Sequence, residues 1–178
     1  MPVYYTAVKR FDPSCGEAWQ NYVSWSGLSH LREVVTLDGI LCSTAFYELT
    51  EEDWKHNVQE DYKTFLFHDL NHVLAAASAN PALSVLAVVQ EPTPDDLRAF
   101  ADPRFAFRGF DLVDKCGDIS ALLNCGGFDK AFSPSELSPC GLLVDLEHAK
   151  RVQQNLHANY PSERHADCNL WAIWTMKS

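Results

Sequence analysis

Two histidines four residues apart, His68 and His72, are the side chains of this sequence best suited to chemistry. On one continuous helix they lie one turn apart, with Asp61 two turns before His68 and Trp54 on the same stripe. An acid, two imidazoles and an aromatic ring would then line up. Such a stripe is a candidate binding or catalytic site.

Imidazoles at positions i and i+4 can chelate zinc, and a carboxylate can complete the ligand set. The sequence here reads His-Asp-Leu-Asn-His, so aspartate replaces the usual glutamate base, and no third ligand is evident downstream. We therefore predict that His68 and His72 form a polar rim of the core, with no bound metal and no cofactor. A zinc site and a metal-free acid–base or recognition site are the alternatives.

Cys125 is a second candidate, in the run Asn124-Cys-Gly-Gly127. Paired glycines let backbone amides approach an anion, and a thiolate there could act as a nucleophile if His68, His72 or His165 served as its base. The same pattern is also typical of a helix C-cap followed by a tight turn, with the cysteine as a small buried residue. We favour this structural interpretation.

The charge balance bears on possible partners. Lys and Arg number 14 against 24 Asp and Glu, so the chain carries −10 at pH 7 and is expected to repel nucleic acid. No serine-hydrolase elbow, P-loop or dinucleotide fingerprint is present. The favoured hypothesis is a non-catalytic module, like an inhibitor or immunity protein, that binds a protein with a basic face. The alternative is a small enzyme using the His68/His72/Asp61 stripe or Cys125; the sequence does not decide between them.

The cellular context follows from what the sequence lacks. Its start has no signal-peptide pattern, and no apolar run is long enough to cross a bilayer, so we expect a cytoplasmic protein. In a reducing compartment the six cysteines, none of them in C-x-x-C spacing, are expected to be free thiols.

The elements that must position these side chains follow from apolar patterning, caps and turn residues. Strands are predicted at 3–10, 31–37, 83–89, 104–114 and 168–176. Helices are predicted at 16–25, 50–78, from Thr93 to before Asp102, after the capping box Ser133-Pro-Ser-Glu136, and from Asp145 to Pro161. A break of the long helix near Asn57 is the alternative for residues 50–78.

The residue alternation within two of the predicted strands allows more detailed predictions. Phe105 and Phe107 share one parity whereas Phe110 and Leu112 share the other, so a β-bulge at Gly109 is needed to return all four to one face. Trp171 and Trp174 have opposite parity, so both are buried only if both faces of the sheet are covered; otherwise one is free to anchor a partner.

Helices and strands do not alternate regularly, and no linker or repeat interrupts the chain. We predict one α+β domain over residues 1–178, with a mixed or mostly antiparallel sheet of four to five strands and three to four helices packed on it.

Overall fold

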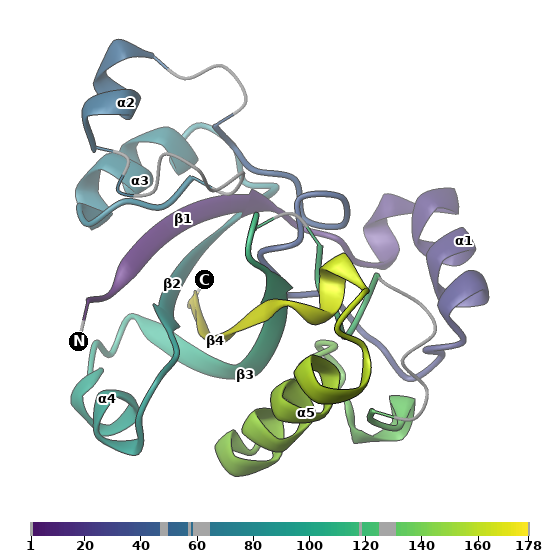
Figure 1. Cartoon of the computed structure of the whole chain (residues 1–178). Coiled ribbons are helices and arrows are strands. Elements are labelled where there is room, and N and C mark those ends of the chain that lie inside the picture. The colour runs from purple at the N-terminus through teal and green to yellow at the C-terminus, as the bar shows by residue number, and fades with distance from the viewer. Residues whose placement is uncertain are drawn as a thin grey trace.

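Four strands form the centre of the protein, as seen in a computed structural model that describes residues 2–46, 50–56, 58, 65–117, 119–124 and 131–177, with the side chains of Trp54 and His56 left out (Figure 1). They are β1 (Tyr4–Lys9), β2 (Leu83–Gln90), β3 (Phe105–Asp114) and β4 (Cys168–Met176). All neighbours pair antiparallel, in the order β1-β2-β4-β3. The predicted strands at these four places are confirmed.

Within the described ranges, five helices and several short turns surround the sheet. The helices are α1 (Glu17–Ser26), α2 (Glu51–His56), α3 (Leu70–Ala77), α4 (Pro94–Ala99) and α5 (Leu146–Asn159). Three of them, α1, α3 and α5, are substantial, so the predicted fold class is confirmed as one α+β domain with a four-stranded antiparallel sheet. The Ser133 capping box opens a 3-10 turn, Pro134–Glu136, rather than a longer helix.

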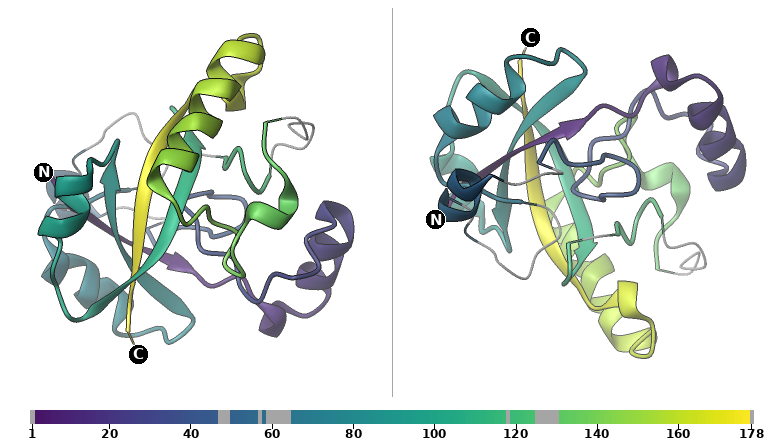
Figure 2. Two further views of the ribbon diagram at one scale, coloured as in Figure 1. Left: turned by 90° about the horizontal axis from the view of Figure 1, so that it is seen from below. Right: turned by 90° about the horizontal axis from the view of Figure 1, so that it is seen from above.

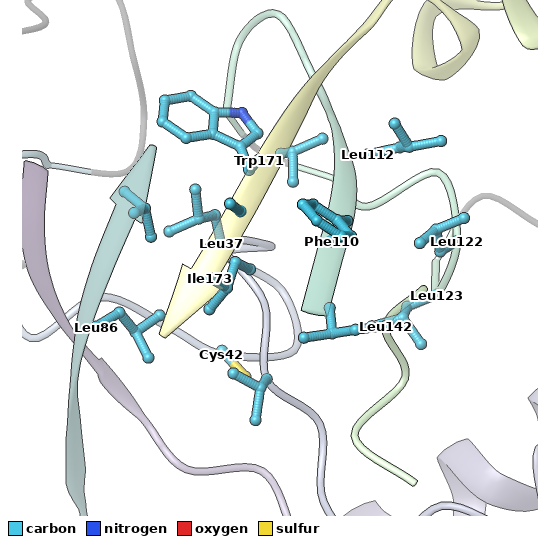
Figure 3. Close-up of a cluster of buried hydrophobic side chains, with 14 of the residues drawn as sticks. Leu37, Cys42, Leu86, Phe110, Leu112, Leu122, Leu123, Leu142, Trp171 and Ile173 are labelled. Atoms are coloured by element: carbon cyan, nitrogen blue, oxygen red, sulfur yellow. The ribbon is translucent and has the colours of Figure 1, made fainter. Parts of the chain in front are cut away.

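Both faces of the sheet are covered. Helix α5 packs on β3 and β4 from one side, while residues 28–46 run across the other (Figure 2). Trp171 and Trp174 point to opposite faces and are 0% and 5% exposed, which is the arrangement predicted for a sheet covered on both faces. Figure 3 shows part of this core, with Trp171 and Ile173 from β4, Leu86 from β2, and Leu37 from the covering segment.

The predicted bulge in β3 is also confirmed. Phe107 pairs with Trp174 and Gly109 with Ile173, which leaves Arg108 as the extra residue. The ring of Phe107 lies 5.2 Å from that of Phe110, as expected if the bulge returns both to one face. Phe107 is nevertheless 43% exposed, so it lies on the same face as Phe110 but is not fully buried there.

The long helix predicted from Thr50 to Ser78 is wrong. Helix α2 ends at His56, and Phe67 instead exchanges two backbone hydrogen bonds with Tyr5 at the edge of the sheet, at 2.7 and 2.9 Å. Asp69 then starts α3 anew, because its side chain accepts from the amide of Asn71 at 2.8 Å. Edge pairing and a local N-cap outweigh the helical pattern here.

The strand predicted over residues 31–37 is wrong as well. Only Val34 forms a bridge, to Phe11, while the amides of Arg32 and Val35 donate to the carbonyls of Pro139 and Cys140. This segment is therefore a covering layer tied on two sides, with its buried apolar side chains facing the sheet.

Candidate anion-binding cavity

His68 and His72 do not share a helix face. His68 precedes the N-cap of α3 and lies against the ring of Tyr4, with ring centres 5.1 Å apart. His72 is on α3, and its Nε2 lies 2.7 Å from Oδ1 of Asp53 on α2. Burial raises the pKa of Asp53, but hydrogen bonds from Thr50 and His72 outweigh it and the pKa is lowered. The predicted geometry is wrong because the helix that it required is broken.

Of the other candidates, only His165 can be placed relative to this pair. Asp61, Cys125 and the side chain of Trp54 lie outside the described residues. His165 is 3.9 Å from Asp114 at the end of β3, which is one edge strand of the sheet, whereas α3 packs on β1 and β2 at the other edge. Within the described ranges, no group of three His, Cys, Asp or Glu side chains could hold a metal.

A cavity of about 360 Å³ lies instead on the sheet face that residues 28–46 cover. All four strands contribute to its floor, through residues that are neighbours across the ladders. These are Val8 of β1, Ser84 and Leu86 of β2, Thr175 of β4 and Ala106 of β3. Val34, Val35 and Cys42 form the facing wall, so apolar side chains and polar or charged side chains share the lining.

The bulge residue Arg108 lines this cavity. Its guanidinium forms an ion pair with Glu33, and its Nη2 donates to Sγ of Cys140 at 3.1 Å. Gly109 makes the bulge possible, since a Cβ there would stand 2.5 Å from the carbonyl oxygen of Leu143. Bulges commonly redirect a side chain toward a site, and this one delivers a cation to the cavity.

A second guanidinium, that of Arg10, lines the same cavity just beyond the end of β1. Its Nε donates to Oγ of Ser84 at 3.2 Å, which holds the side chain over β2. Among the described residues it has no acidic partner, although acids outnumber bases 24 to 14 in the chain. Lys9 and Lys177 add two further cations to the lining, against Asp12 and Glu33. The cavity is locally basic in an acidic protein.

The cavity is better suited to binding than to nucleophilic catalysis. Its thiol, that of Cys42, is 1% exposed and donates to the carbonyl of Val34 at 3.4 Å. Burial raises the pKa of this thiol, with the nearby carboxyls of Asp38 and Asp111 adding to the effect. A neutral thiol is a poor nucleophile, so the lining offers cations and apolar surface rather than a reactive sulfur.

A buried carboxylate network lies behind the cavity wall. Asp111 of β3 accepts from Oγ1 of Thr36 at 2.5 Å, from Oγ of Ser120 at 2.6 Å and from the amide of Leu112 at 2.8 Å. Thr36, Asp111 and Ser120 are each 0% exposed. Burial raises the pKa of Asp111 to about 6, although the hydrogen bonds from Ser120 and Thr36 oppose the shift.

Asp38 completes this network. Its carboxylate accepts from the amides of Ile40 and Leu41, at 2.8 and 3.0 Å, and from the amide of Ser120 at 2.8 Å. Burial raises the pKa of Asp38, and these backbone hydrogen bonds oppose the rise. Every carboxylate oxygen of Asp38 and Asp111 is bonded, so the network fastens residues 36–41 to β3 and leaves no group free for a ligand.

Arg10, Arg108 and Glu33 were not among the sequence candidates. Gly109 was the available signal, since it predicted the bulge from which Arg108 projects. Nothing in the spacing of residues 10, 33 and 108 indicates that they meet, because the pairing of distant strands brings them together.

Comparison of the chain with protein families, curated proteins and solved structures finds no match. Among the described helices, none is long and apolar enough to cross a membrane. Cys15, Cys42, Cys116, Cys140 and Cys168 are free thiols, as predicted, and Cys125 lies outside the described residues.

Proposed function

We propose that this protein is a non-catalytic binding protein that takes a small organic anion into the cavity between Arg10 and Arg108. The observation that carries the proposal is Arg10, a guanidinium without an acidic partner among the described residues of an acidic chain, beside a cavity whose floor combines apolar and hydroxyl side chains. Arginine presents several N–H donors in a planar fork that matches a carboxylate or a similar anion.

The size and lining of the cavity favour an amphipathic ligand. At about 360 Å³ it is within the range of small-molecule sites, which usually combine an apolar lining with a few polar groups that fix orientation. Phe11, Ala106 and Met176, the partly exposed apolar residues of the lining, would contact an apolar body, while the arginines would bind its charged end. The ligand is therefore an organic anion with an apolar part rather than a bare inorganic ion.

The proposal can be tested with two matched probes. 1-Anilinonaphthalene-8-sulfonate has an apolar body with one anionic group, and N-phenyl-1-naphthylamine has the same body without the charge. The native protein is expected to bind the sulfonate at one site, and Arg10→Gln or Arg108→Gln to weaken that binding about tenfold while changing neutral-probe binding less than about twofold. Arg104→Gln, which removes a cation paired with Asp102 outside the cavity, is the matched control.

Near-ultraviolet circular dichroism must be unchanged in each variant, because this dye also binds partly unfolded chains. If the native protein does not bind the sulfonate, or if all three arginine variants bind it equally, the proposal is wrong.

A protein partner with a basic face is a second proposal, and the net charge of −10 favours it. The observation specific to it is Trp25 on α1, which is 62% exposed with its ring 6.1 Å from that of Tyr22. Exposed tryptophans are frequent anchors of protein interfaces. A partner captured from native lysate, identified by mass spectrometry and lost with Trp25→Ala but not with Val144→Ala, would support it. Equal capture by both variants would count against Trp25 as the anchor.

A further inference from the structure

The guanidinium of Arg108 is already paired with a carboxylate of the protein itself, at the place where we propose that a ligand binds. Glu33, from the covering segment, forms an ion pair with its guanidinium, and Sγ of Cys140 lies 3.1 Å from Arg108 Nη2 and 3.5 Å from Glu33 Oε1. Glu33 and Arg108 both line the cavity. The carboxylate of Glu33 therefore already holds the place of an anionic group on this arginine.

The pairing leaves the guanidinium incompletely bonded. Nε of Arg108 is buried and has no hydrogen-bond partner among the described residues. A buried donor left without an acceptor has a free-energy cost. A carboxylate that binds a guanidinium in the bidentate manner can use Nε as one of its two donors, which Glu33 does not do here.

The exchange needs little movement of the backbone. Val34 donates its amide to Phe11 at 2.8 Å and Val35 donates to Cys140 at 3.2 Å, so the main chain around Glu33 is held on both sides. The side chain of Glu33 is 38% exposed and can rotate into solvent, where its charge is hydrated. Replacing one carboxylate by another also avoids leaving Arg108 as an uncompensated, largely buried charge.

We infer that Glu33 is a built-in competitor, and that the carboxylate or sulfonate of an apolar organic anion binds by displacing it from Arg108. This inference rests on the proposed function and adds a ligand class: one singly charged head group, which replaces Glu33 charge for charge, joined to an apolar body. Glu33 then lowers the affinity for every such ligand and has little influence on a neutral one.

The test is Glu33→Gln, measured with the same two probes. Removing the competing charge is expected to tighten binding of 1-anilinonaphthalene-8-sulfonate about tenfold, and to change binding of N-phenyl-1-naphthylamine less than about twofold. Glu147→Gln is the matched control, because it removes one negative charge at an exposed pair with Lys150 on α5 and should leave both affinities unchanged. Glu33→Ala gives the same gain by an independent change.

The double variant Glu33→Gln/Arg108→Gln isolates the pair. If Glu33 acts through Arg108, the double variant binds the sulfonate no better than Arg108→Gln alone. A gain that persists without Arg108, or one matched by Glu147→Gln, would mean that only net charge matters and would overturn the inference. Unchanged or weaker binding by Glu33→Gln, with binding still lost in Arg108→Gln, overturns the competitor role and leaves the proposed function standing. If the native protein does not bind the sulfonate, both proposals are wrong.

Discussion

Two charged regions, the carboxylate network and the cavity, lie on the sheet face that residues 28–46 cover. They differ in how completely their polar groups are hydrogen-bonded. In the carboxylate network, Asp38 and Asp111 receive hydrogen bonds on every oxygen and are 0% exposed. In the cavity, Arg10 lacks an acidic partner among the described residues and Arg108 has a buried Nε without an acceptor. Complete bonding is what a structural anchor needs, whereas incomplete bonding beside open space leaves capacity for a ligand.

The two regions are also joined by one segment. Residues 33–35 form the cavity wall, and residues 36–38 enter the network, so the anchor holds the wall in place. Loss of the anchor should therefore strongly destabilise the protein, whereas loss of a cavity arginine should cost binding with little effect on stability. Each prediction below tests one part of this contrast.

The largest expected effect is that of Asp111→Ala. At pH 5 the variant should lose about 4 kcal/mol of unfolding free energy, because two buried hydroxyls and one amide lose their acceptor. Arg108→Gln should lose less than about 1 kcal/mol, since its ion pair is partly exposed. Urea unfolding measures both. If both variants lose the same unfolding free energy, the contrast between the carboxylate network as an anchor and the cavity as a binding site is wrong.

The pH dependence of stability is the next test. Asp111 has a pKa of about 6 in the folded chain against 3.8 for an ordinary aspartate, so between these values the folded state binds more protons than the unfolded state. Its contribution to stability is complete below pH 3.8 and is lost as the pH rises to about 6, a decrease of about 3 kcal/mol.

Asp111→Asn should remove this part of the pH dependence, because the amide does not titrate. The unfolding free energy of the native protein and of Asp111→Asn is measured from pH 3.5 to 7.5. The difference between the two proteins is then compared across this range. A difference that stays constant over this range would mean that Asp111 does not titrate as an isolated buried acid.

Gly109→Ala tests the bulge that delivers Arg108 to the cavity. At φ +140° an added Cβ would lie 2.5 Å from the Leu143 carbonyl oxygen and 2.8 Å from Leu142 Cβ, so we expect a loss of about 2 kcal/mol and weaker sulfonate binding. Gly27→Ala, with φ +69° and open space around its Cβ, is the control and should cost about 1 kcal/mol without affecting binding. If Gly109→Ala binds the sulfonate as tightly as the native protein does, the bulge is not needed for binding at this site.

The smallest expected effect is at His72, whose pair with Asp53 is largely buried and does not line the cavity. His72→Gln should cost about 1 kcal/mol in thermal unfolding at neutral pH, the contribution of one hydrogen bond, and leave sulfonate binding unchanged. Stoichiometric zinc in the native protein, lost in a His68→Ala/His72→Ala variant that still folds, would contradict the polar-rim interpretation of both histidines.

The sequence by itself determined those elements whose causes are local. Strand burial follows from continuous apolar runs in β2 and β4, the start of α4 from the Thr93/Asp96 capping box, and the bulge from the parity change at Gly109. Each signal lies within about ten residues of its effect, so no distant partner is needed to interpret it.

Tertiary structure decided the rest, because distant partners compete with local patterns. Phe67 lies in a segment of helical periodicity, but the unpaired edge of β1 offers its backbone two hydrogen bonds, and this divides the predicted helix. Val34 lies in a strand-like run, yet its neighbours bond to residues 139 and 140. Arg10, Glu33 and Arg108 meet only because the sheet order places β1, β3 and the covering segment around one cavity, so their role depends on pairings that sequence spacing does not encode.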